Sequence, residues 1–430
     1  MTELPAGWVW ETLESVLLDQ SRGRKLQQGW SPKCETSPAG VSEWGVLKTT
    51  AIQAGRFDGS HNKRLPDGLS PRNSIEVHEG DLLITCAGPR NRCGIPALVR
   101  HAPQKLMLSG KMYRFRPNES IDSAFLELWL LSPEAQAMID KMKTGISDSG
   151  LNLTHDRFLA LPVPVPPMPV QLQIVRFVEE QLSRVEAAHA LLSNAKRGAD
   201  AWYAGLADAL IWGQSWPLVQ IDQLLRTPMR NGRSDRAVTD GSAGIRTLTI
   251  TAVTRNSFTD EHTKITTTSA SVAKRLWLEP GDIFVQRANT PELVGTAARY
   301  SGPRDWAIFP DLLIRIRADE GQVDSRYLVE AIRTERAHRT LRQKAKGLAG
   351  SMPKIDQGAL GETLVPVPRR QDQVAIIEQL EEARESAARI HAAISSAEIR
   401  GRALRSSLLI AAVTGQLRFE SSKGITDYVH

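Results

Sequence analysis

The sequence contains little cysteine and no long apolar run. Only Cys34, Cys86 and Cys93 occur, an odd number without a Cys-x-x-Cys pair. This argues against a disulfide framework and a structural zinc site, and it favours a reducing compartment. No stretch approaches about 18 consecutive apolar residues, and residues 1–5 lack the basic and apolar regions of a signal peptide. We therefore expect no membrane span and a cytoplasmic location.

The common catalytic signatures are also missing. There is no G-x-x-x-x-G-K-[ST] phosphate loop and no G-x-G-x-x-G segment that opens a helix. The [ND]-P-P-[YFW] tetrapeptide of amino-methyltransferases and the H-x-E with P-C-x-x-C deaminase pattern are absent. The nine histidines are scattered rather than spaced as metal ligands. We predict no catalytic residue and no metal site, although a nuclease triad assembled from isolated Asp, Glu and Lys stays an alternative.

What the sequence does contain is an internal repeat. The matches are Val163–Pro166 with Val365–Pro368 (365 − 163 = 202), Lys63 with Lys264 (264 − 63 = 201) and Trp8 with Trp216 (216 − 8 = 208). The change of offset places one insertion or deletion between Val16 and Val46. Solenoid and propeller periods run at roughly 20 to 50 residues, so this repeat is neither. It predicts two similar domains related by an approximate two-fold axis.

A proline-rich stretch in each half precedes a predicted long helix. Apolar residues then recur at steps of four and three. This seam comprises Ile174, Val178, Val185, Leu192, Trp202 and Leu206 in the first copy, and Ile376, Leu380, Ile390, Ile394, Leu404 and Leu408 in the second. A spacing of 3.5 residues over about five heptads is typical of a coiled coil. We expect the two helices, each roughly 40 residues and 60 Å long, to pair antiparallel; packing of each helix on its own domain is the alternative.

The segments ahead of the helices are predicted to be mixed α/β domains. Short β-branched runs bounded by turns alternate with one helical stretch in each half, Ser123–Met142 and Asp324–Lys344. The fold class is therefore α/β (α+β), with two similar globular domains and two long helices. The predicted boundaries are 1–160 for the first domain, 161–215 for the first lead-in and helix, 216–362 for the second domain, 363–418 for the second lead-in and helix, and 419–430 for a tail.

Positive charge is concentrated in the globular segments. Residues 20–117 carry 16 Lys plus Arg against 7 Asp plus Glu, an excess of 9, and residues 216–360 carry 22 against 16, an excess of 6. The helical residues 161–215 are balanced, with 4 against 5. This is the distribution expected if the two domains, and not the helices, contact a polyanion. A basic pI is also common among soluble proteins, so charge alone does not define the partner.

Several local patterns accompany the repeat. They are Leu4–Trp8, Glu43–Lys48, Pro280–Ile283 with Glu292–Gly295, and the proline-rich lead-ins that end in Gln171 and Gln373. With the repeat, they resemble the specificity subunits of type I restriction-modification enzymes over nearly the whole chain. That family has two target-recognition domains, each followed by a long helix, and its helices pair as an antiparallel coiled coil.

The resemblance implies a non-catalytic, sequence-specific DNA-binding subunit that recognises a bipartite, asymmetric target. The implied partners are double-stranded DNA, two methyltransferase subunits and restriction/translocase subunits. S-adenosylmethionine, ATP and Mg are expected on those partner subunits and none on this chain. The alternatives are a specificity subunit of a stand-alone methyltransferase or of a type IIB-like nuclease-methylase, or a coiled-coil scaffold protein without DNA binding.

Polar loops in each half are candidates for reading DNA, because Arg distinguishes guanine and Asn adenine, while Lys holds phosphate. The candidates are Arg22, Arg24, Lys25, Asn62, Lys63, Arg64, Arg90, Asn91 and Arg92 in the first half, and Arg230, Asn231, Arg233, Arg236, Arg255, Asn256, Arg287 and Asn289 in the second. Residues 230–236 are interpreted as the counterpart of residues 21–25, where the repeat offset breaks and the halves are free to differ. We hypothesise that Arg230 or Arg233 contacts guanine; a solvated surface loop is the alternative.

Overall fold

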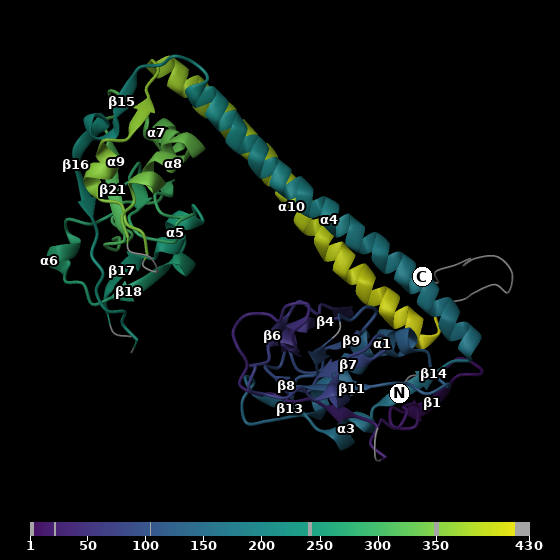
Figure 1. Cartoon of the computed structure of the whole chain (residues 1–430). Coiled ribbons are helices and arrows are strands. Elements are labelled where there is room, and N and C mark those ends of the chain that lie inside the picture. Colours follow the sequence, from purple (N-terminus) through teal and green to yellow (C-terminus); the bar gives the residue numbers. More distant parts are fainter. Residues whose placement is uncertain (1–3, 21–22, 104, 240–242, 348–351, 418–430) are drawn as a thin grey trace. The chain divides into compact units, whose positions relative to one another are not determined.

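The computed structural model describes residues 4–20, 23–103, 105–239, 243–347 and 352–417 (Figure 1). Arg22 and the predicted tail, 419–430, lie outside the described residues. The chain forms two compact units: unit 1 comprises Met1–Leu191 and Ser396–His430, and unit 2 comprises Leu192–Ser395. Each unit holds one mixed α/β globular part and a portion of each long helix. The predicted fold class is confirmed.

Unit 1 is built on a four-stranded antiparallel sheet. In spatial order its strands are β2 (Gln27–Gln28), β11 (Met112–Phe115), β7 (Leu82–Thr85) and β9 (Pro96–Leu98). Strands β7 and β11 are buried along their whole length. Their apolar side chains face both ways, with Leu82 and Ile84 in one core and Leu83 in another. The sheet is therefore covered on both faces, by helix α1 on one side and by a smaller sheet on the other.

The remaining elements of unit 1 surround this sheet. They are β10 (Leu106–Met107), β3 (Gly45–Leu47) and β6 (Asn62–Arg64) in one small sheet, β12 (Lys143–Thr144), β13 (Leu151–Leu153) and β8 (Ala87–Gly88) in a second, β4 (Ile52–Gln53) with β5 (Arg56–Phe57), and β1 (Val9–Thr12) with β14 (Pro162–Val165). The helices are η1 (Thr49–Ala51), η2 (Asn73–Ile75), α1 (Ser123–Leu131), α2 (Pro133–Met142) and α3 (His155–Leu159). Pairing of β1 with the proline-rich strand β14 joins the beginning of the unit to the start of its long helix.

Unit 2 repeats the same strand order. Its central sheet is β16 (Leu225–Asn231), β21 (Leu313–Ala318), β19 (Ile283–Gln286) and β20 (Ala297–Arg299). Two pairs complete its strands, β17 (Ile245–Leu248) with β18 (Thr263–Thr266), and β15 (Leu218–Gln220) with β22 (Leu364–Pro366). Its helices are η3 (Ile221–Leu224), α5 (Ile250–Thr254), η4 (Asp260–His262), α6 (Ala270–Ala273), α7 (Ser325–Arg333), α8 (Glu335–Lys344) and α9 (Gln357–Gly361). The sequence repeat is therefore a repeat of structure.

Each helical stretch predicted in the globular halves is a pair of helices. Asp122 caps α1 by accepting hydrogen bonds from two backbone amides, and Asp324 caps α7 in the same way with one. The break before α2 falls at Ser132, because Pro133 occupies the first helical position and Ser132 serves as the new cap. Local sequence chemistry thus explains where these helices begin.

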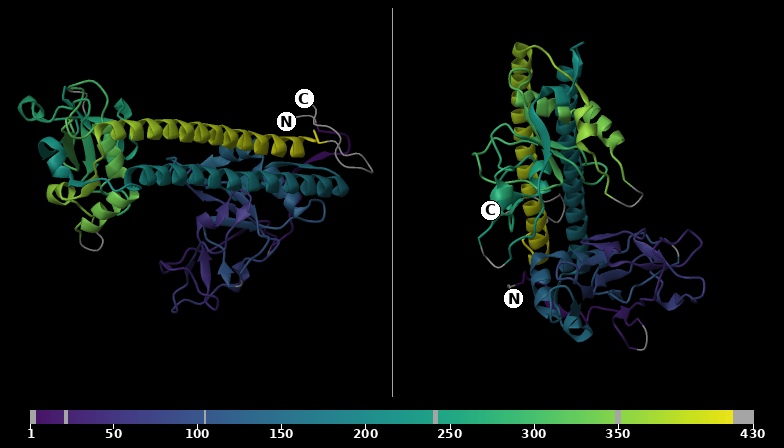
Figure 2. Two further views of the ribbon diagram at one scale, coloured as in Figure 1. Left: turned by 90° about the horizontal axis from the view of Figure 1, so that it is seen from above. Right: turned by 90° about the vertical axis from the view of Figure 1, so that its left-hand side faces the viewer.

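Two helices of 45 residues follow the proline-rich strands, α4 (Met168–Trp212) and α10 (Arg370–Thr414). In unit 1, Ile174 at the start of α4 shares a core with Val413 at the end of α10. In unit 2, Ile211 at the end of α4 shares a core with Ile376 at the start of α10. Within each unit the two helices therefore lie side by side and antiparallel (Figures 1 and 2). Over the described ranges, no helix is long and apolar enough to cross a membrane.

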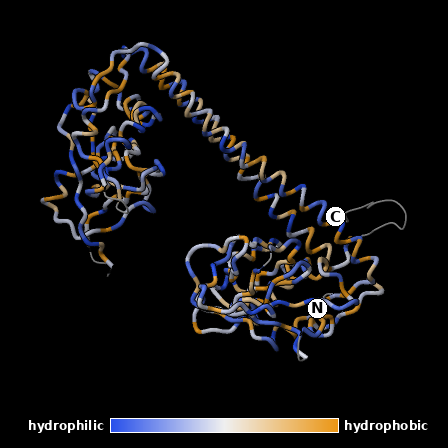
Figure 3. The backbone as a smooth tube through the Cα atoms, viewed as in Figure 1, coloured by the Kyte–Doolittle hydropathy of each residue, from blue (hydrophilic) through white to orange (hydrophobic). Residues whose placement is uncertain are grey.

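Apolar residues recur among polar ones along both long helices (Figure 3). Of the predicted seam, the buried members are Ile174, Val178, Ile376, Leu380, Ile394 and Leu408, and the half-buried members are Val185, Leu192 and Leu206. The prediction is wrong for Trp202, Ile390 and Leu404, which are 48%, 42% and 49% exposed. An α-helix drifts about 20° per heptad relative to a strict 3.5 spacing. Trp202 and Leu404 lie four heptads beyond Ile174 and Ile376 (28 residues in each case), so they have rotated out of the interface.

One buried glutamine at the start of each long helix ties it to the globular part. The Gln171 side chain accepts from the Asp122 amide at 2.7 Å and donates to the carbonyls of Ser120 and Pro166 at 3.0 and 2.8 Å. Gln373 makes the same three contacts 202 residues later, with Asp324, Gln322 and Pro368, at 2.8, 3.2 and 2.9 Å. Both side chains are completely buried. The start of each helix is thereby fixed to the cap residue of the helix that follows the central sheet.

Candidate nucleic-acid interface

The edge strands β2 and β16 occupy equivalent places in the two units. Gln27 lies opposite Arg114, and Arg230 lies opposite Arg315. Since Arg114 and Arg315 are themselves equivalent (315 − 114 = 201), Gln27 is the counterpart of Arg230 at an offset of 203. The predicted pairing of residues 230–236 with residues 21–25 is therefore wrong. Where the offset between the two halves of the repeat changes, strand register and not sequence identity shows which residues are equivalent.

The segment that follows each edge strand takes the same backbone path in both units. A Cβ at Gly29 would overlap the carbonyl oxygen of Leu108, and a Cβ at Gly232 would overlap that of Phe309. The next residues, Trp30 and Arg233, donate their amides to the same two carbonyls at 3.0 and 2.9 Å. Ser31 and Ser234 then accept from the amides of Gly110 and Asp311, at 3.1 and 3.3 Å, through their hydroxyls. The path is fixed, while the side chains on it differ, with a half-buried Trp30 in unit 1 and an exposed Arg233 in unit 2.

A second equivalent pair of positions carries lysine in both units. Lys63 on β6 lies opposite Val46, and Lys264 on β18 lies opposite Thr247. Both lysines are exposed. Neither side chain forms a hydrogen bond or ion pair with a described residue. A cation kept at the same place in both halves suits a contact common to both, such as a phosphate, which carries no sequence information.

Several candidate DNA-contacting residues are already ion-paired within the protein. Arg64 binds Glu35 at 2.6 Å and Glu43 at 3.0 Å, and these hydrogen bonds, that of Glu35 first, raise the pKa of Arg64. Arg90 pairs with Asp148 and Asp140 at 3.1 and 2.8 Å. The others are Lys25 with Asp19 at 3.0 Å and Arg233 with Asp235 at 2.9 Å. Each would have to exchange a carboxylate for DNA, which weakens its case as a base contact.

Other candidates serve the fold directly. Asn62 is 5% exposed and holds the Ala39 amide and the Gly59 carbonyl. The rest of this group are Arg92, which donates to the carbonyls of Thr49 and Ile52, Asn231, which accepts from Gln357, Asn256, which accepts from Arg333, and Asn289, which bonds Gln286 and the Thr290 amide. Structural roles explain these polar side chains without a ligand.

The remaining candidates have no side-chain hydrogen bond or ion pair with any described residue. They are Arg24, Lys63, Asn91, Arg230, Arg236, Arg255 and Arg287. All are exposed except Arg287, which is half-buried. Their side-chain donors are available to a ligand. These seven therefore stay the candidates for contact with DNA.

Sequence reasoning missed Arg72. Its guanidinium lies 4.1 Å from the centre of the Trp30 ring, on the segment that follows β2. Such a cation–π contact is worth about 0.5 to 1 kcal/mol at an exposed site and orients the guanidinium. No local pattern marks this arginine, because its aromatic partner lies 42 residues earlier (72 − 30 = 42).

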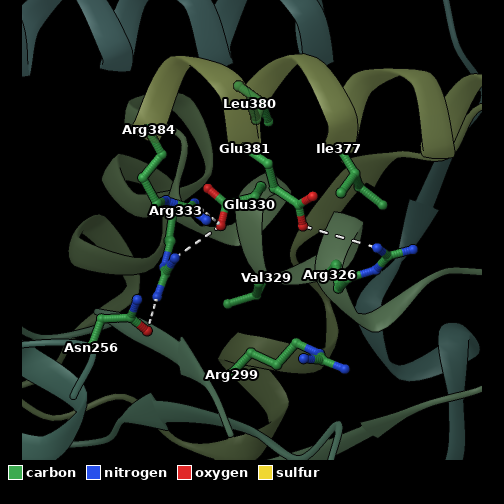
Figure 4. A pocket seen from close by; sticks show the side chains of 10 residues that line it. All are labelled: Asn256, Arg299, Arg326, Val329, Glu330, Arg333, Ile377, Leu380, Glu381 and Arg384. Carbon is green, nitrogen blue, oxygen red and sulfur yellow. Dashed lines mark hydrogen bonds and ion pairs between the residues drawn. The ribbon is translucent and has the colours of Figure 1, made fainter. Parts of the chain in front are cut away.

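A polar pocket in unit 2 lies between α7 and α10 (Figure 4). Glu330 of α7 accepts from Arg333 at 2.9 Å, from Arg384 of α10 at 2.6 Å and from Tyr203 of α4 at 3.0 Å. Burial raises the pKa of Tyr203 to about 12, so its hydroxyl remains a donor. Arg333 also holds Asn256, which has the left-handed backbone angle φ 46° that asparagine tolerates. The network joins the Asn256 loop to the long helices of its unit.

No group of three or more His, Cys, Asp or Glu residues within the described part of the chain is arranged to hold a metal ion. Cys34, Cys86 and Cys93 are free thiols, and burial raises the pKa of each of them.

Comparison with known proteins connects this architecture to DNA specificity. A family model described as the type I restriction modification DNA specificity domain matches residues 46–194. The EcoEI type I restriction enzyme specificity subunit of Escherichia coli is 33% identical over 210 residues, which are 48% of this chain and 34% of that protein. The EcoKI specificity subunit of Escherichia coli strain K12 is 26% identical over 187 residues, 42% of this chain and 38% of that protein. The chain thus covers about a third of the length of the curated relatives it matches.

A solved structure supports the fold. One chain from a structural study of complex assembly and conformational transition in a type I restriction-modification system matches with a TM-score of 0.73 and 17% identity. The match covers 97% of this chain and 100% of that one. Residues 46–194 match the type I restriction modification DNA specificity domain. The chain's predicted resemblance to type I specificity subunits is confirmed.

Proposed function

We propose that this chain is the DNA-recognition subunit of a type I restriction-modification system and reads a bipartite, asymmetric target. The observation that carries the proposal is one fold used twice with different side chains at equivalent positions of the edge strand and of the segment that follows it. Gln27 and Trp30 in unit 1 stand where Arg230 and Arg233 stand in unit 2. Because base edges are distinguished by side-chain donors and acceptors, two such surfaces read different half-targets.

The chemistry is assigned to partner subunits. Two methyltransferase subunits would bring S-adenosylmethionine, and restriction/translocase subunits would bring ATP and Mg. This chain contributes binding and position. The lysines shared at positions 63 and 264 hold phosphates in either half, and the side chains that differ between the halves select bases.

The proposed function predicts a sequence-defined loss of DNA methylation when the gene is deleted. Methylated adenines would be mapped across the genome of the source cell with the gene present, deleted and restored. We expect one interrupted motif, asymmetric between its two halves, to lose methylation on deletion and to regain it on restoration. An unchanged set of methylated adenines would contradict the proposal. A scaffold protein without DNA binding would give that unchanged set.

We propose that the paired helices set the spacing between the half-targets. Insertion of one heptad at the middle of both α4 and α10 keeps their apolar faces in phase and lengthens each by about 10 Å. At 3.4 Å per base pair, the gap in the methylated motif should grow by about three base pairs, with both half-targets unchanged. The same heptad in α4 alone breaks the pairing and serves as the control, for which we expect lost methylation. A gap of unchanged length in the double insertion would refute the spacing role.

A further inference from the structure

Arg114 and Arg315 are equivalent buried arginines in the central sheets of the two units, 8% and 7% exposed. Arg114 donates to the carbonyls of Glu76 and Ser74, the latter at 3.1 Å. Arg315 donates to the carbonyls of Trp277 and Arg275, at 3.0 and 3.3 Å, and these stand at the same offset of 201 (277 − 76 and 275 − 74). The two guanidiniums therefore sit in closely matched backbone cages.

The buried acid beside each arginine is matched as well. Arg114 lies 3.6 Å from Asp81, and Arg315 lies 3.8 Å from Asp282. Each aspartate is completely buried and makes its shorter contact, 2.6 Å in both units, with the arginine two residues further along the chain, Arg116 or Arg317. Arg114 and Arg315 thus share their strand position, the backbone carbonyls that they donate to and a buried aspartate.

The neighbour on the edge strand differs. In unit 1 the side-chain oxygen of Gln27 accepts a hydrogen bond from Arg114, while the Gln27 amide donates to Ser74 at 2.8 Å. In unit 2 the same place is taken by Arg230, directly opposite Arg315. An arginine has no acceptor and brings a second positive charge, and like charges directly opposite each other destabilise a sheet. Arg315 thus lacks the side-chain acceptor that Arg114 has.

The added charge is only partly offset: the Phe309 ring centre lies 5.1 Å from the Arg315 guanidinium, and the charges of Asp282 and Glu279 act to raise the pKa that burial lowers. Glu279 already binds Arg317 and Arg226, each at 3.0 Å, and Asp282 is engaged by Arg317. Arg230 is exposed, and its side chain makes no hydrogen bond or ion pair with a described residue. Burial lowers the pKa of Arg315 to about 10, and the charge of Arg230 acts in the same direction. The acidic groups around the pair make their shorter contacts with other arginines.

We propose that Arg230 contacts DNA through an acceptor of the bound duplex, and that its position beside Arg315 makes unit 2 less stable without DNA than a glutamine there would. This inference rests on the proposed function. It selects Arg230 over Arg233, whose guanidinium is already paired with Asp235 at 2.9 Å. The acceptor is a guanine edge or a backbone phosphate, both of which suit a guanidinium.

The test is Arg230→Gln in the full chain, which copies into unit 2 the residue found in unit 1. Without DNA we expect the thermal unfolding midpoint to rise by about 2 to 4 °C, because Arg315 regains an acceptor and loses a like charge. Gln27→Arg, the reciprocal change, should lower the midpoint. Lys274→Gln removes an exposed charge that has no described partner and should leave the midpoint unchanged. A midpoint that stays the same or falls in Arg230→Gln would overturn the stability part.

Binding is measured on duplex DNA carrying the motif found by methylation mapping, with wild type as the reference. We expect Arg230→Gln to bind roughly tenfold to a hundredfold more weakly. Relaxed preference at one base pair identifies a guanine contact. A uniform loss over all sequences, with a salt dependence reduced by about one ion, identifies a phosphate contact. Equal affinity and preference in variant and wild type would overturn the contact; wild type that binds no DNA would instead refute the proposed function, and the unfolding measurements would still decide the stability part.

Discussion

Replacing Asp282 by asparagine is expected to lower the free energy of unfolding of unit 2 by about 3 to 5 kcal/mol. The Asp282 carboxylate is completely buried and accepts from Arg317 at 2.6 and 3.2 Å, with Arg315 at 3.8 Å. Removing only the negative charge leaves two largely buried guanidiniums facing each other. The loss of one partner from a buried group of charges costs much more than the loss of a surface ion pair.

The measurement is urea unfolding of the full chain, followed by a probe in unit 2. Asp305→Asn is the matched control, because Asp305 is exposed, has no described side-chain partner and has a φ of 57° that asparagine tolerates. We expect this control to change the free energy of unfolding by less than about 0.5 kcal/mol. If Asp282→Asn were as stable as the control, the aspartate would not hold the sheet together.

Replacing Gln373 by alanine is expected to lower the free energy of unfolding by about 3 kcal/mol or more. The change leaves the Asp324 amide and the carbonyls of Gln322 and Pro368 without the partner they have in the folded chain. Each buried polar group left unsatisfied costs about 1 to 3 kcal/mol, less whatever water recovers. The effect should be local to the junction between the globular part and α10.

Amide hydrogen exchange tests whether the effect is confined to the junction between the globular part and α10. The Asp324 amide should exchange faster in Gln373→Ala, and urea unfolding should report the loss of stability. Gln371→Ala removes an exposed glutamine from the first turn of the same helix and is the control; both readouts should stay near the wild-type values. Unchanged protection of the Asp324 amide in Gln373→Ala would show that the glutamine does not fix the start of the helix.

The long helices and the repeat were predictable because both leave periodic marks in the sequence. Proline at positions 162, 164 and 166 excludes a helix before Met168, and apolar residues every three or four positions then identify one. The same periodicity misplaced Trp202 and Leu404, since the apolar step gives the period of a helix and not its exact twist. Helix existence followed from the sequence, whereas which of the seam residues are buried required coordinates.

The candidate interface was predictable in kind but not in detail. Charge and loop composition indicated which segments carry donors. They did not reveal that Arg64 is bound by Glu35 and Arg90 by Asp140, partners 29 and 50 residues away. Nor did they place Gln27 opposite Arg114, because the offset between the halves changes just before that strand. Partner choice and strand register are long-range properties, which no local pattern records.

The segments after β2 and β16 share one backbone conformation, which a glycine and a serine fix in each half. Gly29 and Gly232 leave no room for any other residue, and Ser31 and Ser234 anchor the next turn, so the backbone between them does not depend on which side chains project from it. The residue between the two anchors, Trp30 in one unit and Arg233 in the other, can therefore differ while the backbone stays the same. An engineer seeking new combinations of half-targets can exchange the residues at positions 30 and 233, whereas positions 27 and 230 lie in the edge strands and must match Arg114 and Arg315.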